Sequence, residues 1–172
     1  TKGKDYLFMK IFKFFRKCRY FFAIFIICRN PFTIIGYLFQ TIFKLKKADI
    51  GIIKLKNGVQ LKTRLDVPGH LTSFIDVYYK RIYFNFDINV DNPVVLDVGA
   101  SIGDFSIGVL NEFPSAKIFS FEPDPKSFSL LKENILLNNA EKNVKAFNFG
   151  IDSESKGRFK KLWRKFFWRI KL

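Results

Sequence analysis

The stretch Pro93-Val94-Val95-Leu96-Asp97-Val98-Gly99-Ala100-Ser101-Ile102-Gly103 decides the fold of this chain. Its apolar run, Val94 to Leu96, is what a buried parallel strand requires, because such a strand is covered on both faces. The run ends in Asp97 and turns through two glycines, which lack a Cβ and tolerate positive φ where a ligand approaches the backbone. A helical pattern then runs from about residue 103 to 113, and the backbone N–H groups of the glycine turn and of the first helical turn are expected to hold a polar ligand.

A second strand pattern follows the first at the spacing of a βαβ unit. The apolar run Lys117 to Phe121 ends in Glu122. A glycine turn after one strand and a carboxylate after the next are typical of a nucleotide-binding fold, in which the carboxylate accepts hydrogen bonds from the ribose hydroxyls. Asp124-Pro125 then opens a helix that continues to about residue 139, and residues 143–149 are predicted as a third strand.

The carboxylate ahead of the glycines favours one cofactor over another. Asp97 lies two residues before Gly99, where its charge would repel the pyrophosphate of a dinucleotide. The same charge suits the sulfonium and ammonium groups of S-adenosylmethionine, and the pattern is typical of class I methyltransferases. We therefore predict a Rossmann-like α/β sheet with S-adenosylmethionine as cofactor. The predicted cofactor-binding residues, from the turn and the end of the second strand, are Asp97, Gly99, Ala100, Ser101, Gly103 and Glu122. No catalytic base can be assigned, and no metal site is predicted.

Within that class the chain resembles the FkbM family over roughly residues 50 to 160. The resemblance is carried by residues 95–103, by Phe121-Glu122-Pro123-Asp124-Pro125 and by Leu130-Leu131-Lys132-Glu133-Asn134. It implies O-methylation of a hydroxyl on a sugar or other small molecule. Ser101 stands where the family usually has asparagine. The family would continue with four more strands after Gly150, so the sheet is expected to be truncated after its third strand.

Charge divides the chain into a neutral centre and two basic arms. Residues 1–49 carry 11 Lys/Arg against 2 acids, residues 50–150 carry 11 against 11, and residues 151–172 carry 8 against 2. We predict four segments from this division and from the motifs. They are a helical extension (1–49), a hairpin and helix lead-in (50–92), the cofactor-binding half-domain (93–155) and a basic amphipathic tail (156–172).

The N-terminal arm is expected to form two short helices that meet at Asn30-Pro31. Its longest apolar run, Tyr20 to Cys28, has nine residues, too few for a transmembrane helix, which needs about twenty. The apolar faces are expected to pack on the domain or to lie on a membrane surface. In the lead-in, Asn57-Gly58 predicts a two-residue hairpin turn, and helical spacing predicts a helix over residues 69–83.

The tail has its apolar residues on one face of a helical wheel and most of its basic residues on the other. The apolar positions are Phe159, Leu162, Trp163, Phe166, Phe167 and Ile170. This segment could bind an anionic membrane, or it could be an out-of-frame end without a selected role. Cys18 and Cys28 are expected to be reduced thiols, and His70 is expected in a solvated loop.

Three functions are compatible with these patterns. The first is an FkbM-type methyltransferase acting on a small-molecule or glycan acceptor. The second is a truncated, non-catalytic relative, whose first strand would leave an apolar sheet edge. The third is a basic, aromatic protein that contacts a membrane peripherally. Nucleic acid is not expected as a partner, because the arms are too rich in phenylalanine and isoleucine for a solvated phosphate groove. A cytoplasmic location is expected, at the membrane surface if the arms bind there.

Overall fold

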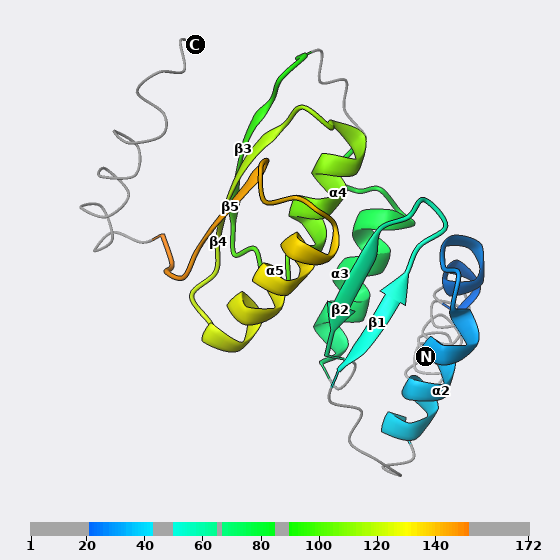
Figure 1. The fold of residues 1–172 in the computed structure, drawn as a ribbon. Helices are drawn as coiled ribbons and strands as arrows, with labels where there is room; N and C mark the ends of the chain where they lie inside the picture. The colour runs from blue at the N-terminus through cyan, green and yellow to red at the C-terminus, as the bar shows by residue number, and fades with distance from the viewer. Residues whose placement is uncertain (1–20, 43–49, 65–66, 85–89, 152–172) are drawn as a thin grey trace, which may run out of the picture. The chain divides into compact units, whose positions relative to one another are not determined.

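The structure is a computed structural model that describes residues 21–42, 50–64, 67–84 and 90–151. The chain divides into two compact units between Asn89 and Val90. The first unit holds helices and a β-hairpin, and the second holds a parallel sheet with two helices (Figure 1). The predicted tail, residues 156–172, and Cys18 lie outside the described residues.

The first unit is built around the predicted hairpin. Strands β1 (Gly51–Lys54) and β2 (Gln60–Thr63) pair antiparallel, and Gly58 in the connecting turn has a φ of +97°. Helices α2 (Pro31–Ile42) and α3 (Pro68–Tyr78) belong to the same unit. The hairpin itself is confirmed, but its loop has three residues, 56–58, rather than two, because the N–H of Leu55 donates to the carbonyl of Val59 at 2.8 Å. Helix α3 ends earlier than predicted. His70 lies in α3 rather than in a loop, with its Nδ1 3.3 Å from Thr63 Oγ1.

The described part of the N-terminal arm packs on the hairpin. Residues 21–27 are helical and are separated from α2 by residues 28–30. The side chain of Asn30 donates to the carbonyl of Ile52 at 2.8 Å and accepts from the N–H of Lys54 at 2.9 Å. Cys28 is a free, buried thiol, and burial raises its pKa to about 12. A row of large apolar side chains on this arm is exposed, namely Phe21, Phe22, Ile26, Phe32 and Phe39. Among the described helices, none has the length and apolar character needed to cross a bilayer.

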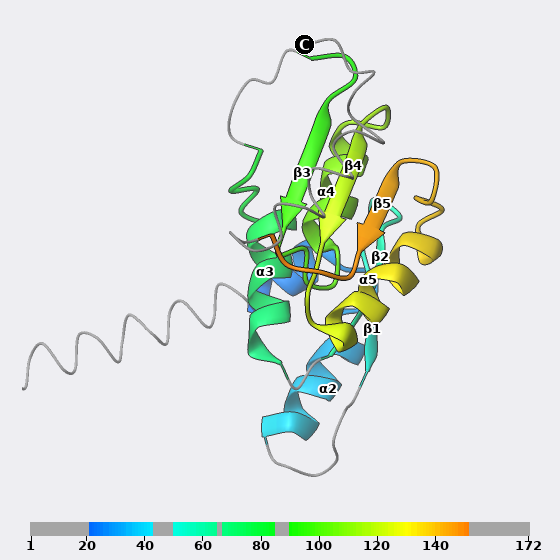
Figure 2. The ribbon, with the colours of Figure 1, turned by 90° about the vertical axis from the view of Figure 1, so that its left-hand side faces the viewer.

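The second unit is a three-stranded parallel sheet in the order β3-β4-β5. Its strands are β3 (Val94–Val98), β4 (Lys117–Phe121) and β5 (Val144–Phe147), and its helices are α4 (Asp104–Glu112) and α5 (Pro125–Leu137). Figure 2 shows the three strands side by side, with α4 and α5 behind them on one face. This alternation of strand and helix confirms the predicted Rossmann-like α/β class.

Local sequence sets the start of each helix in this unit. The side chain of Asp124 caps α5 by accepting the N–H of Ser127 at 2.8 Å, and Pro125 occupies the first turn, where its missing N–H removes no bond. Helix α4 starts after Gly103, which adopts the left-handed conformation. The helices bury apolar side chains against the sheet, among them Ile107, Ile118 and Leu131.

Strand β3 differs from its prediction, because one of its faces is exposed. Val94, Leu96 and Val98 are 37%, 40% and 59% exposed. The reason is that β3 pairs with β4 alone in the described sheet, and both described helices of this unit lie on the opposite face (Figure 2). On β4 the same face is buried, since Phe119 and Phe121 pack with Phe147, Phe149 and Ile151.

Candidate functional site

The glycine turn and the end of β4 are joined directly by backbone hydrogen bonds. The N–H groups of Gly99 and Ala100 both donate to the carbonyl of Phe121, at 2.9 and 3.0 Å. In the sheet register Asp97 is paired with Ser120. Because parallel strands end at the same edge, Asp97 and Glu122 lie at one rim, and the electrostatic influence of Glu122 on Asp97 agrees with this. The predicted site residues are therefore brought together.

Glu122 ties the two turns of the site to each other. Glu122 as a whole is only 7% exposed. Oε2 accepts the N–H of Ser101 in the glycine turn, and Oε1 accepts the N–H of Asp124 at the start of α5, both at 2.7 Å. Hydrogen bonds to an ionised carboxylate are about twice as strong as neutral ones. Glu122 thus fixes the turn, and each oxygen still has a lone pair for a further donor.

Asp97 is a buried carboxylate held by a serine pair. Its Oδ2 accepts the hydroxyl of Ser106 at 2.5 Å, and the Ser106 and Ser120 hydroxyl oxygens lie 2.7 Å apart. Burial raises the pKa of Asp97 to about 6; the Ser106 hydrogen bond opposes this, and the nearby charges of Asp104 and Glu122 add to it. A cation in contact with these carboxylates would relieve their repulsion, so the site has the chemistry of a sulfonium or ammonium receptor.

Positive backbone φ angles shape the turn, at +81° for Gly99, +49° for Ser101 and +84° for Gly103. A Cβ built on Gly99 meets no atom within 4 Å, whereas one on Gly103 would lie 2.5 Å from Leu131 Cδ1. Gly103 is therefore required for close packing of the turn on α5 as well as for its conformation. Gly99 is required for its conformation alone.

The turn uses its N–H groups differently from the expectation that they would hold the ligand. Those of Gly99 and Ala100 bond to β4, that of Ser101 bonds to Glu122, and that of Gly103 bonds to the Ala100 carbonyl at 2.8 Å. These four donors stabilise the turn itself.

Three polar residues support the site and were not predicted. Ser106 positions Asp97. Asn148 Nδ2 donates to the carbonyl of Glu122 at 2.9 Å, and Asn134 Nδ2 donates to the carbonyl of Ile102 at 2.8 Å. Asn134 is completely buried. A polar residue on the apolar face of α5 was the one sequence signal that could have identified it.

We predict that Asp97→Asn stabilises the ligand-free protein at neutral pH. The folded protein holds the Asp97 proton more tightly than the unfolded chain, so this carboxyl favours folding at low pH and opposes it as pH rises through about 6. At pH 7.5 the buried charge costs about 3 kcal/mol. The stability gained by Asp97→Asn should therefore grow by about 2 kcal/mol between pH 4.5 and 7.5, measured by urea unfolding at both pH values.

The control for this prediction is Asp91→Asn, which removes an exposed carboxylate just before β3, at the opposite end of the strand. Its effect should be within about 0.5 kcal/mol at both pH values. A gain for Asp97→Asn that does not depend on pH would contradict the assignment of the raised pKa.

Comparison with known proteins gives the family of this site. The model of the TRM5/TYW2 methyltransferase domain matches residues 70–159. Methyltransferase sdnD of Sordaria araneosa is 37% identical over 81 residues, which cover 45% of this chain and 31% of that protein. The tRNA(Phe) (4-demethylwyosine(37)-C(7)) aminocarboxypropyltransferase of Pyrococcus horikoshii is 31% identical over 101 residues, which cover 59% of this chain and 34% of that protein. The structure of M. jannaschii TYW2 in complex with AdoMet is 26% identical with a TM-score of 0.44, and the match covers 59% of this chain and 44% of that one.

The chain spans about a third of the length of the curated relatives that it matches. The comparisons confirm the predicted class, an S-adenosylmethionine-dependent methyltransferase domain, and they correct one finer expectation. The family model that matches is TRM5/TYW2, so the finer FkbM assignment stays a prediction; an FkbM methyltransferase from Methylobacillus flagellatus is 16% identical with a TM-score of 0.36. The expectation that no nucleic acid is involved is contradicted, because a relative in this family is named for its action on tRNA.

The match includes both acidic strand ends, the glycine turn and the two helices that hold them. It covers just over half of the sequence. This chain therefore belongs to the TRM5/TYW2 methyltransferase domain family.

Proposed function

We propose that the rim formed by β3, β4 and the glycine turn binds S-adenosylmethionine. Asp97 faces the cationic methionine end of the cofactor, and the remaining lone pairs of Glu122 accept the ribose hydroxyls. The glycine turn allows the cofactor to approach the backbone between them. The observation that carries this proposal is the hydrogen bond from Ser101 N–H to Glu122 Oε2, which couples the turn to the second acidic strand end.

The residues of the site fit such a cofactor in charge as well as in shape. Asp97, Asp104 and Glu122 are all buried. The negative charges of Asp104 and Glu122 raise the pKa of Asp97, in addition to the larger effect of burial. A bound sulfonium supplies an activated carbon that a nucleophile can attack with departure of the thioether. The chain's own residues bind and orient this group, since in-line positioning contributes much of the rate of such transfers.

We propose RNA as the acceptor of the transferred group. Support comes from the family assignment and from the Pyrococcus horikoshii relative, whose name specifies tRNA(Phe). The net charge of +15 also favours a polyanionic partner, because lysine and arginine contacts to phosphates supply most of the non-specific affinity for nucleic acids.

A second candidate is O-methylation of a small-molecule hydroxyl, as the FkbM resemblance implies. It is favoured by the segments 95–103 and 121–125, which carry that resemblance. The two candidates differ in what they predict for RNA. Only the first requires the chain to bind an RNA strand in the same domain as the cofactor.

Calorimetric titration with S-adenosylhomocysteine, which retains the ribose and the ammonium group, tests the cofactor site. The unmodified chain should release or absorb heat with a one-to-one stoichiometry. Asp97→Asn should weaken binding at least tenfold, about 1.4 kcal/mol, although it stabilises the fold. Asp91→Asn should bind as the unmodified chain does. Equal affinities for all three proteins, or no binding to any, would contradict the proposal.

A further inference from the structure

Four phenylalanines of the N-terminal arm form a continuous aromatic patch in the first unit. The patch consists of Phe21, Phe22 and Phe25 on the helical segment 21–27 and of Phe32 in the first turn of α2. The ring centres of Phe21 and Phe22 lie 6.4 Å apart, those of Phe21 and Phe25 lie 5.2 Å apart, and those of Phe25 and Phe32 lie 5.5 Å apart. The aromatic patch therefore joins the two helical segments of the arm.

The aromatic patch is exposed although the arm is folded. Phe22 and Phe32 are 64% and 77% exposed. Other side chains of the same two helical segments, among them Ile24 and Ile34, are almost completely buried. The core of the unit thus uses one side of the arm and leaves the phenylalanines outside it. Contiguous apolar surface of this kind marks a site of contact with another protein or a membrane.

Two cations are held beside the aromatic patch by the hairpin loop. Lys56 Nζ donates to the carbonyl of Phe25 at 3.1 Å, and Arg29 Nη2 donates to the carbonyl of Lys56 at 3.4 Å. Both residues are exposed. The described segments 21–42 and 50–64 contain no aspartate or glutamate, and their basic residues are Arg29, Lys54, Lys56, Lys62 and Arg64. The surroundings of the patch are therefore positively charged.

This combination matches the chemistry of an anionic lipid surface. Apolar side chains enter the boundary between headgroups and acyl chains, and lysine or arginine stays at the level of the lipid phosphates. Ile26 is 55% exposed and lies four residues after Phe22, a spacing that makes the two side chains neighbours on a helix. An aliphatic side chain next to the rings gains as much from acyl chains as the rings do.

Other partners use these features less well. A nucleic acid gains from stacking on the faces of aromatic rings, but here the rings of Phe25 and Phe32 pack edge to face at 85°, and Ile26 offers no ring. A second copy of the chain related by twofold symmetry would bring the same patch of each copy together. It would place Arg29 and Lys56 near their own counterparts, and such like-charge contacts are unfavourable.

We propose that the aromatic patch docks the chain on an anionic membrane surface, with Phe22 and Phe32 inserted below the headgroups and with Arg29 and Lys56 at the lipid phosphates. This inference goes beyond the proposed function, because it assigns a membrane contact to the first unit. It involves no residue of the cofactor rim, so each of the two can fail without the other.

The test measures co-sedimentation of the full chain with phosphatidylcholine vesicles that contain about 30% phosphatidylglycerol. Phe22→Ser/Phe32→Ser should lower the partition coefficient about tenfold at low and at high salt, because apolar insertion is not screened. Arg29→Gln/Lys56→Gln should lower it about tenfold at roughly 50 mM salt and less than about twofold at roughly 500 mM salt, because the attraction to lipid phosphates is screened.

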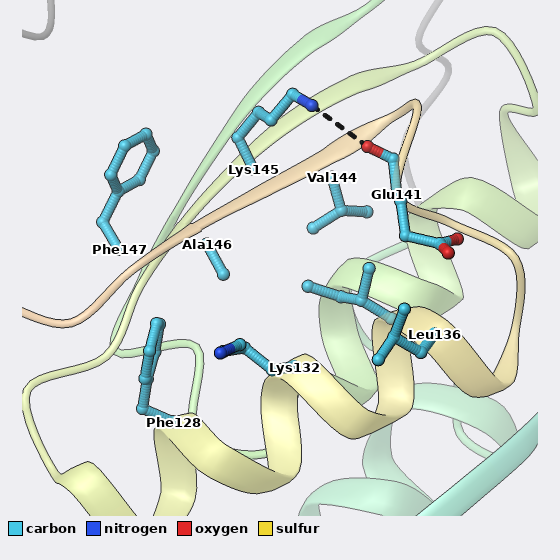
Figure 3. Close-up of a pocket in the computed structure, with 9 residues that line it drawn as sticks. Phe128, Lys132, Leu136, Glu141, Val144, Lys145, Ala146 and Phe147 are labelled. Atoms are coloured by element: carbon cyan, nitrogen blue, oxygen red, sulfur yellow. Dashed lines mark hydrogen bonds between the residues drawn. The ribbon is translucent and has the colours of Figure 1, made fainter.

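The second unit offers a matched control for each variant. Leu136→Ser removes an apolar side chain that is 58% exposed and that lies on α5 beside the groove between this helix and β5 (Figure 3). Lys117→Gln/Lys142→Gln removes two exposed lysines. Each control should change the partition coefficient less than about twofold, because side chains outside the contact contribute little. An effect of the patch variants no larger than that of their controls would overturn the proposal, as would an unmodified chain that stays in solution.

Two further measurements on the same proteins identify a different occupant of the patch. Sedimentation velocity would reveal a dimer that Phe22→Ser/Phe32→Ser dissociates, and fluorescence anisotropy with a labelled oligouridine would reveal RNA binding that this variant loses. Either result, combined with unchanged partitioning onto the vesicles, would assign the patch to that partner and overturn the membrane contact. Partitioning lost in both patch variants, with oligouridine binding and the sedimentation coefficient unchanged, would support it.

Discussion

Replacing Glu122 with alanine is expected to abolish cofactor binding and to destabilise the second unit. The substitution removes acceptors from two backbone N–H groups, those of Ser101 and Asp124, which hold the glycine turn and the start of α5. Each hydrogen bond to a charged group contributes about 1.5–3 kcal/mol, so the free energy of unfolding should fall by about 3–6 kcal/mol. The affinity for S-adenosylhomocysteine should fall more than 100-fold, because the ribose acceptor and the shape of the turn are lost together.

Glu122→Gln separates the two roles of this side chain. Glutamine retains one acceptor oxygen but places an NH₂ group against a backbone N–H, so it should be less destabilising than alanine yet still weaken cofactor binding at least tenfold. Glu141→Gln, at an exposed position before β5, is the control and should leave both quantities unchanged. Urea unfolding and calorimetry on the three variants measure them. Cofactor affinity that survives in Glu122→Gln and Glu122→Ala would show that this carboxylate is only structural.

Gly103→Ala is expected to cause the largest loss of stability among the single-methyl substitutions of the turn. The added Cβ would lie 2.5 Å from Leu131 Cδ1, and Leu131 is completely buried, so the leucine has little room to move. The left-handed φ of +84° adds about 1–2 kcal/mol and the overlap adds about 1–3 kcal/mol. Thermal unfolding should show a decrease of about 2–5 kcal/mol in the free energy of unfolding.

Gly99→Ala is the matched control, because it has nearly the same φ without the overlap. Its cost should be limited to about 1–2 kcal/mol of backbone strain. The double variant Gly103→Ala/Leu131→Ala should lose less stability than the sum of the two single losses, because removing the Leu131 side chain makes room for the added methyl group. Additive losses would show that the two groups do not touch. Equal losses for the two glycine variants would argue against close packing of α5 on the turn.

Local sequence predicted the elements of the second unit because each one carries its own signal. Lys117 to Phe121 was predicted as a strand with the bounds that the structure has. Asp124-Pro125 contains both a capping carboxylate and a proline suited to the first helical turn, so the start of α5 was predicted as well. The hairpin at Asn57-Gly58 followed from turn chemistry alone.

Properties that depend on contacts between elements were not predictable in the same way. The exposed face of β3 depends on which elements cover it and not on its own residues, which predict a strand buried on both faces. The N–H groups of the glycine turn were expected to face a ligand, but β4 and Glu122 accept them. Ser106 and Asn148 were missed because their roles arise only when the turn, the sheet and the helices meet.

Nuclear magnetic resonance tests the central claim most directly, since it reports on individual backbone amides. A ¹⁵N-labelled chain is titrated with S-adenosylhomocysteine, and amide shifts are followed for each assigned residue. The largest changes should occur at Gly99, Ser101, Gly103 and Glu122, and the amides at the amino ends of β3 and β4 should stay unchanged. Shifts confined to other parts of the chain, or a spectrum that does not respond to the ligand, would contradict a cofactor site at this rim.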